Sequence, residues 1–218
     1  DDLRIEALQR CGQLYQPNCK LVATPSKGNV PLDVQFSATG SSDPDGTIER
    51  YLWDFGDGTN AVGPTAQHGY TKAGKYTISL TVVDDSGAPV TCTTVMDVNG
   101  YPTACFEPDL EMIQEGGSVT FDADCSKDKD GSIALYSWTF GDGATGKGKT
   151  VTHKYPDPGL YDVVLVTRDD DGAQTTSAPK VITVNDQPTA FFEWTPAMPT
   201  PGAMVAFDSA TSTDTDGE

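Results

Sequence analysis

The chain has 218 residues and a formal net charge of −18, with 14 Lys plus Arg against 32 Asp plus Glu. This length allows one large β domain or two ordinary domains. A chain this acidic lacks the positive electrostatic potential that attracts phosphates. This argues against nucleic-acid binding and against adhesion to an anionic membrane. No apolar run approaches the roughly 20 residues of a membrane span. The start at Asp1-Asp2 shows no signal peptide, so we expect a mature or excised piece of a longer protein.

The first 16 residues differ from the rest. Their apolar positions fall near helical spacing, and Asp1 and Asp2 stand where acids favour a helix start. We therefore predict a short helical lead over residues 1–16, packed on the domain that comes after it. The alternative is the end of a preceding domain or an assembly contact.

An internal repeat with an offset of 85 is the strongest signal in the sequence. Asp43-Pro-Asp45-Gly becomes Asp128-Lys-Asp130-Gly, and Tyr-Leu-Trp53-Asp-Phe-Gly-Asp-Gly becomes Tyr-Ser-Trp138-Thr-Phe-Gly-Asp-Gly. A third copy begins with Pro188-Thr-Ala and reaches Asp214-Thr-Asp216-Gly. The predicted organisation is a lead (1–16), two repeats (17–99 and 100–185) and the start of a third (186–218). We expect that the third copy continues in a longer chain; the alternative is strand addition to a neighbouring subunit.

Each repeat predicts an all-β domain. Alternating apolar residues run through 34–37, 76–82 and 161–166, and glycine-rich turns separate these segments. Several short strands in about 85 residues indicate an Ig-type β-sandwich. Trp53 and Trp138 are predicted to be core residues of a central strand, with a sugar-stacking platform as the alternative.

The Trp-Asp-Phe-Gly-Asp-Gly segment, after a DPDG turn and before H-x-Y and V-x-D-D, resembles the PKD domain family. The resemblance covers residues 17–98 and 102–184 in full and 188–218 in part. Thr139 is a departure, because the family usually has Asp there. The resemblance implies tandem Ig-like β-sandwiches that serve as spacer, adhesion or protein-contact modules and are not themselves catalytic.

The DxDG turns place two carboxylates two residues apart, and the glycine permits a sharp turn. Two carboxylates so close repel each other unless protons or a cation intervene. Ca²⁺ accepts such oxygens in flexible geometry, but the spacing is not that of an EF-hand. The alternative is an ordinary solvated Asp-Gly turn without metal.

Calcium-binding members of the PKD family use ligands that resemble the Asp pair, a preceding linker Asn and an Asp of V-x-D-D. The second repeat matches best, whereas the first has Leu14 where the linker Asn would be. A cation shared between Asn99 and the second repeat would stiffen the linker, which predicts a calcium-dependent rod. The resulting candidate calcium ligands are Asn99, Asp128, Asp130, Asp169 and Asp170; Asp43, Asp45, Asp84 and Asp85; and Asn185, Asp214 and Asp216.

Five cysteines and no CxxC motif argue against a zinc knuckle and favour two disulfides with one spare thiol in a secreted chain. Cys105 and Cys125 fall on neighbouring predicted strands, so we expect them to be bonded. For Cys11, Cys19 and Cys92 the sequence leaves open Cys11–Cys19 or Cys19–Cys92.

No catalytic motif of the G-x-S-x-G, HExxH or P-loop type occurs, and we predict that the chain is not an enzyme. Asp57 and Asp142 lie in glycine-flanked turns, where Asp most often caps backbone amides. His68 and His153 occupy the same repeat position, which favours a structural role over a general base.

The main functional interpretation is an extracellular structural or adhesive region, a calcium-stiffened spacer or contact module of a cell-surface or filament protein. Its expected partners are protein or polysaccharide at a cell surface or matrix, or other copies of itself. The alternative is an accessory region with which a secreted protease, collagenase or chitinase engages its substrate.

Overall fold

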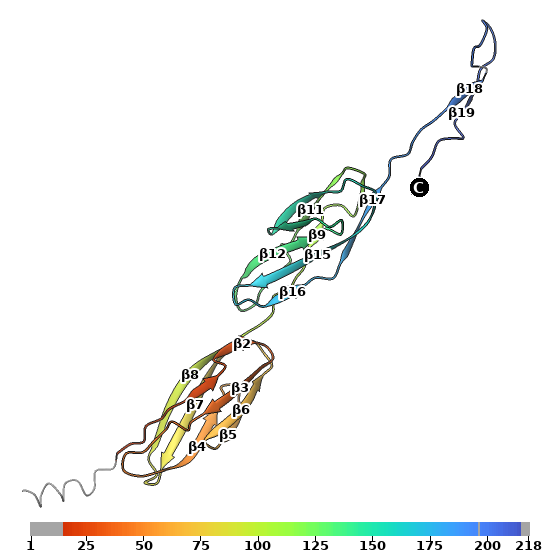
Figure 1. The fold of residues 1–218 in the computed structure, drawn as a ribbon. Coiled ribbons are helices and arrows are strands. Elements are labelled where there is room, and N and C mark those ends of the chain that lie inside the picture. The colour runs from red at the N-terminus through yellow and green to blue at the C-terminus, as the bar shows by residue number, and fades with distance from the viewer. Residues whose placement is uncertain (1–14, 196, 215–218) are drawn as a thin grey trace, which may run out of the picture. The chain divides into compact units, whose positions relative to one another are not determined.

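The structure is a computed structural model, and it describes residues 15–195 and 197–214. The predicted helical lead, apart from Tyr15 and Gln16, lies outside the described residues, and so do Cys11, Leu14 and Asp216. The described residues are all-β and contain no helix (Figure 1). Among them there is accordingly no helix long and apolar enough to cross a membrane. The chain divides into two compact units, Asp1–Tyr101 and Pro102–Glu218, which are described separately.

The first unit is a β-sandwich of a three-stranded and a five-stranded sheet. The small sheet has the order β1-β3-β6, and the large sheet has the order β2-β8-β7-β4-β5. All pairs are antiparallel except β2 with β8, which is parallel. The strands are β1 (Val22–Thr24), β2 (Lys27–Asn29), β3 (Leu32–Ser37), β4 (Ile48–Asp54), β5 (Asn60–Val62), β6 (Thr65–Tyr70), β7 (Gly74–Asp84) and β8 (Pro89–Asn99).

The second unit repeats this plan and adds a hairpin. Its small sheet has the order β14-β11-β9, and its large sheet has the order β10-β17-β15-β12-β13 with β16 also paired to β15. The hairpin is β18 with β19. The strands are β9 (Glu107–Pro108), β10 (Met112–Gln114), β11 (Ser118–Asp122), β12 (Ile133–Thr139), β13 (Thr145–Lys147), β14 (Thr150–Lys154), β15 (Gly159–Asp169), β16 (Gln174–Thr176), β17 (Lys180–Asn185), β18 (Glu193–Thr195) and β19 (Ala206–Asp208).

Alternation in the sequence places one apolar face of each sheet in the core. In β3 the residues at positions 32, 34 and 36 are buried and those between them are exposed. Trp53 and Trp138 are buried within the two equivalent cores, as predicted, and each indole Nε1 donates to a carbonyl, of Gly63 at 2.9 Å and of Gly148 at 2.8 Å. Burial with a satisfied N–H is the favourable state of tryptophan in a sandwich, so neither indole is a sugar platform.

Near the start of each copy, one serine hydroxyl hydrogen-bonds to both the backbone N–H and the backbone carbonyl of a single residue in the preceding segment. Ser126 Oγ accepts from the Cys105 N–H at 2.9 Å and donates to its carbonyl at 2.6 Å. We call this arrangement the serine clasp. Ser41 forms it with Lys20, and Ser212 forms it with Phe191 in the hairpin segment.

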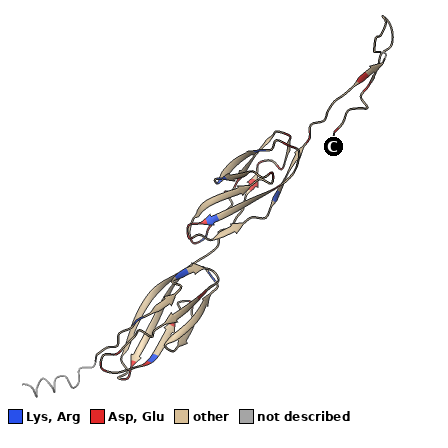
Figure 2. Cartoon of the chain, viewed as in Figure 1, with Lys and Arg blue, Asp and Glu red and all other residues tan. Residues whose placement is uncertain are grey.

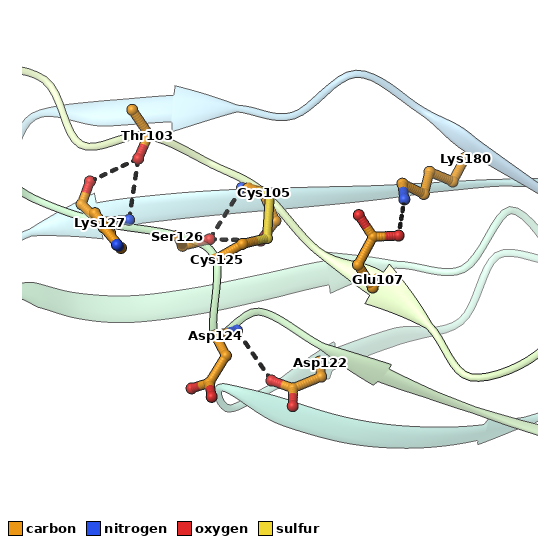
Figure 3. The surroundings of a disulfide bond; sticks show 9 residues. All are labelled: Thr103, Cys105, Glu107, Asp122, Asp124, Cys125, Ser126, Lys127 and Lys180. Atoms are coloured by element: carbon orange, nitrogen blue, oxygen red, sulfur yellow. Dashed lines mark hydrogen bonds and ion pairs between the residues drawn. A yellow bond between two sulfur atoms is a disulfide. The ribbon is translucent and has the colours of Figure 1, made fainter.

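Each sandwich contains a disulfide, and the two bonds join different positions of the repeat. Cys105–Cys125 confirms the predicted bond and lies beside the clasp of the second repeat (Figure 3). Cys19–Cys92 is formed in the first repeat, which settles the alternatives that the sequence left open. The bonds span 20 and 73 residues of sequence respectively.

Candidate functional site

The DPDG turn of the first repeat lines a pocket together with the end of β7. The pocket has a volume of about 190 Å³. Its lining consists mainly of acidic side chains, four of which are candidate calcium ligands from the sequence. The lining residues are Tyr15, Asp43, Asp45, Asp84, Asp85 and Ser86.

Glycine in each DxDG turn leaves room for two carboxylates to converge. A Cβ on Gly46 would lie 2.1 Å from Asp85 Oδ1 and 2.6 Å from Asp43 Oδ2. In the second repeat a Cβ on Gly131 would lie 2.5 Å from Asp170 Oδ1 and 2.8 Å from Asp128 Oδ2. Any side chain at these glycines would therefore displace carboxylates, which explains why the turn needs glycine.

Three carboxylate oxygens at these turns are buried without a hydrogen-bond partner. They are Asp43 Oδ1, Asp84 Oδ2 and Asp128 Oδ2. Asp84 is only 2% exposed, and its other oxygen accepts from Ser86 Oγ at 2.8 Å and from the Ala88 N–H at 2.7 Å. Buried polar atoms are normally paired, so these oxygens are the atoms at which a bound cation would compensate most.

The pKa values follow from this crowding. Burial raises the pKa of Asp43, and repulsion from Asp45 and Asp84 adds to the increase. Burial likewise raises the pKa of Asp128, with Asp130 and Asp169 contributing repulsion. Burial also acts upward on Asp84, but hydrogen bonds from Ser86 and Ala88 hold its pKa below the ordinary value.

Three of the other predicted aspartate ligands accept backbone hydrogen bonds. Asp169 is buried at the end of β15 and accepts from the Ala173 N–H at 2.7 Å. Asp170 accepts from the Ser132 N–H at 2.9 Å, and this hydrogen bond lowers its pKa. Asp45 accepts from the Tyr15 N–H at 3.2 Å.

The two linker asparagines belong to strands. Asn99 ends β8, is 8% exposed and donates to Asn29 Oδ1 at 3.0 Å. Asn185 ends β17, and its Nδ2 lies 3.8 Å from Met112 Sδ. Asp214 follows the bridge between Thr189 and Thr213 in the third copy.

The described residues contain no group of three or more His, Cys, Asp or Glu side chains already gathered closely enough to hold a metal. The carboxylates therefore line the pocket without forming a coordination shell. The unpartnered buried oxygens and the glycine that a side chain would obstruct nevertheless fit a cation that takes several oxygens in flexible geometry.

A His–Asp pair recurs at the opposite end of each Trp strand. His68 Nε2 lies 2.7 Å from Asp57 Oδ2, and His153 Nε2 lies 2.7 Å from Asp142 Oδ2. Each imidazole stacks on a phenylalanine ring, of Phe55 at 4.4 Å or of its second-repeat counterpart at 4.1 Å. The pair joins the turn after β4 or β12 to the small sheet. The sequence predicted a capping role for each Asp and a structural role for each His. It did not predict the hydrogen bond between them.

Comparison with known proteins identifies the domain type. Residues 15–98 and 99–184 each match the family described as "PKD domain". The pre-pro-metalloprotease PrtV of Vibrio cholerae serotype O1 is 39% identical over 146 residues, 67% of this chain and 16% of that protein. The collagenase ColA of Clostridium perfringens is 39% identical over 95 residues, 44% of this chain and 8% of that protein.

One further relative and one solved structure are also similar to this chain. A microbial collagenase of Vibrio alginolyticus is 34% identical over 110 residues, covering 50% of this chain and 12% of that protein. The crystal structure of the PKD1 domain from the Vibrio cholerae metalloprotease PrtV shares 36% identity and a TM-score of 0.35, and covers 38% of this chain and 98% of the domain. The chain thus spans less than a fifth of each of these curated relatives.

Proposed function

Because residues 15–98 and 99–184 belong to the PKD domain family, we propose that this chain is a non-catalytic accessory region that engages the protein substrate of a secreted hydrolase. The observation that carries this proposal is the identity of 39% over 67% of the chain to a pre-pro-metalloprotease. Two relatives are named collagenases, which makes a collagen-like protein the first substrate to test.

The structure supports a binding role rather than a catalytic one. PKD domains are non-catalytic modules, and the described residues form no catalytic fold. The His–Asp pairs occupy the same position in both sandwiches and join a turn to a sheet, which is a structural task. Two disulfides suit an extracellular location, because oxidising conditions preserve such bonds.

The test is a sedimentation assay of the folded chain with insoluble fibrous collagen. We expect the chain to pellet with collagen, and we expect its reduced and heat-unfolded form and an unrelated acidic protein to stay in solution. If no collagen-dependent pelleting occurs at any concentration, and none occurs with other fibrous proteins, the accessory function is wrong.

The acidic turns support a second role, that of a calcium-stabilised spacer or adhesive module. We propose that Ca²⁺ binds beside Asp43, Asp84 and Asp85 in the first repeat and beside Asp128 and Asp170 in the second. The buried unpartnered oxygens are the supporting observation. When bound, the ion would supply positive charge that stabilises carboxylates crowded within each turn.

The calcium proposal is tested by thermal unfolding in Ca²⁺, Mg²⁺ and EDTA. At a Ca²⁺ concentration about 100 times Kd, we expect about 2.7 kcal/mol of added stability per occupied domain. The double variant D43N/D85N should lose the effect in the first repeat only. Identical unfolding in Ca²⁺ and EDTA would reduce these aspartates to turn residues.

A further inference from the structure

Strand β4 has an edge that is only partly covered. Strand β7 pairs with β4 from Ile48 to Asp54, whereas β5 pairs with it only from Leu52 to Asp54. Gly63, at a φ of +112°, donates its N–H to the Tyr51 carbonyl at 3.1 Å, and the chain then leaves toward β6. No described strand pairs with residues 48–50 on the β5 side. An uncovered strand edge can accept another strand.

A groove lies at this place. It has a volume of about 320 Å³ and runs where β5 ends. Leu52 and Val62 are direct cross-strand partners at the groove, and they are 39% and 76% exposed. We call it the strand-end groove; its lining residues are Glu49, Arg50, Tyr51, Leu52, Val62, Gly63 and Pro64.

Arg50 is the cationic side chain of the strand-end groove, whose lining also contains the acidic Glu49. The chain carries 32 acidic residues, yet Arg50 makes no ion pair with any residue that the structure describes. Figure 2 shows how sparse Lys and Arg are along the strands. An arginine fork matches a carboxylate through two parallel hydrogen bonds. Within the groove, Arg50 together with Leu52 is therefore complementary to a carboxylate beside an apolar side chain.

The second repeat has the same backbone at this place but different side chains. Gly148 donates its N–H to the Tyr136 carbonyl at 3.2 Å, and β13 pairs with β12 only from Ser137 to Thr139. The fold therefore sets the uncovered edge in both repeats. The fold does not set the side chains that line this edge. At the offset of 85, the second repeat has Leu135 for Arg50, Ser137 for Leu52, Lys147 for Val62 and Lys149 for Pro64.

We propose that the strand-end groove binds an extended segment of a protein substrate, which adds as a strand beside residues 48–50. The carboxylate of the segment pairs with Arg50, and an apolar side chain near it packs on Leu52 and Val62. Arg50 and Leu52 are two residues apart and share a face, so the acidic and apolar residues of the segment are expected at a spacing of two. This inference rests on the proposed substrate-engaging function.

The probe is a short fluorescein-labelled peptide with the pattern Glu-Thr-Val in a β-prone context, measured by anisotropy with the whole chain. We expect Arg50→Gln to weaken binding at least about tenfold, because a charge-assisted pair is lost. Replacing the peptide glutamate by glutamine should weaken it equally, and should have no further effect on the Arg50→Gln variant. Arg168→Gln removes the same charge from the second repeat and should change binding less than about twofold.

Two further variants test the apolar part and the mode of binding. Leu52→Ser and Val62→Lys introduce the residues that the second repeat already carries, so the fold should tolerate them while binding falls. Hydrogen exchange should slow for amides within 48–50 on adding peptide and stay unchanged within 133–135. A peptide that does not bind, or that binds equally to Arg50→Gln and wild type, overturns the proposal.

The outcomes separate this inference from the proposed function. If the chain pellets with collagen and Arg50→Gln pellets equally well, the strand-end groove is not the contact and the accessory function stands. If the peptide binds as expected and no fibrous protein is retained, the groove stands and the accessory function fails. If sedimentation shows a dimer of the wild type that Arg50→Gln dissociates, the groove serves self-association, and the proposal is wrong.

Discussion

The two sandwiches share one backbone plan and differ in what they place on it. Both have the buried Trp with its N–H bonded to a glycine carbonyl, the His–Asp pair and the serine clasp. They differ in the disulfide, in the side chains at the uncovered edge and in the distribution of arginine. The shared features are the requirements of the fold, and the differences are therefore the places where function can be sought.

The disulfides should give the largest difference between the repeats. Chain entropy predicts about 4.4 kcal/mol for the bond that closes 73 residues and about 3.3 kcal/mol for the bond that closes 20. Replacing Cys19 and Cys92 by Ala should therefore destabilise the first repeat more than replacing Cys105 and Cys125 destabilises the second. Hydrogen exchange of peptides covering β3 and β11 reports each repeat separately. Equal losses would mean that the closed loop length does not govern these bonds.

The tryptophans should give equal effects. Trp53→Phe and Trp138→Phe each remove an indole N–H bond and leave a small void, at a cost of about 2 kcal/mol. Denaturant titration with the same two exchange probes measures both. If the two losses of stability differ by more than about 1 kcal/mol, the two cores are energetically less alike than their matching residue contacts indicate.

The His–Asp pair should make each repeat sensitive to acid. Burial acts to raise the pKa of Asp57, but hydrogen bonds from Thr59 and His68 outweigh it and leave the pKa lowered; Asp142 is lowered in the same way by His153 and Ala144. A lowered carboxyl pKa contributes stability above the unfolded value near pH 4, and this contribution is lost as the pH falls through the folded pKa.

Asp57→Asn should therefore cost about 1 kcal/mol at pH 7 and less at pH 2. Urea unfolding at the two pH values measures the change, and Asp142→Asn is the matched variant. An equal cost at both pH values would assign the effect to packing of the turn rather than to the charge.

The groove variants should have the smallest effect on stability. Leu52→Ser and Val62→Lys change exposed side chains and should shift the free energy of unfolding by less than about 0.5 kcal/mol. Thermal unfolding checks this, with Trp53→Phe as the positive control. A larger loss would mean that the apolar lining is required by the first sandwich and is not free to serve a partner.

The repeat made most of the fold predictable from sequence. The offset of 85 aligned two Trp strands, and alternation around Phe36 and Leu80 identified core residues. Cys105–Cys125 was predictable because the two residues flank neighbouring strands: Cys105 precedes β9, and Cys125 follows β11, which pairs with β9. Cys19–Cys92 was not, because it joins the segment before β1 to β8, and spacing alone does not specify how the two sheets are stacked.

The candidate sites were predictable only in part. The DxDG motif identified Asp43 and Asp128, but not that one oxygen of each is buried without a partner. The strand-end groove was missed, since no motif marks it. The signal lay in the repeat itself, where Leu52 and Val62 stand against Ser137 and Lys147 in an otherwise retained segment.

The serine clasp also bears on the order in which the bonds of the chain form during oxidative folding. The clasp residue Ser126 is next to Cys125, and its partner is Cys105, so in the folded chain the clasp holds the two cysteines close together. Closing a loop of 20 residues costs less entropy than closing one of 73. Cys105 and Cys125 should be oxidised first, whereas Cys19 and Cys92 must wait until β8 has docked, so the two repeats mature at different times.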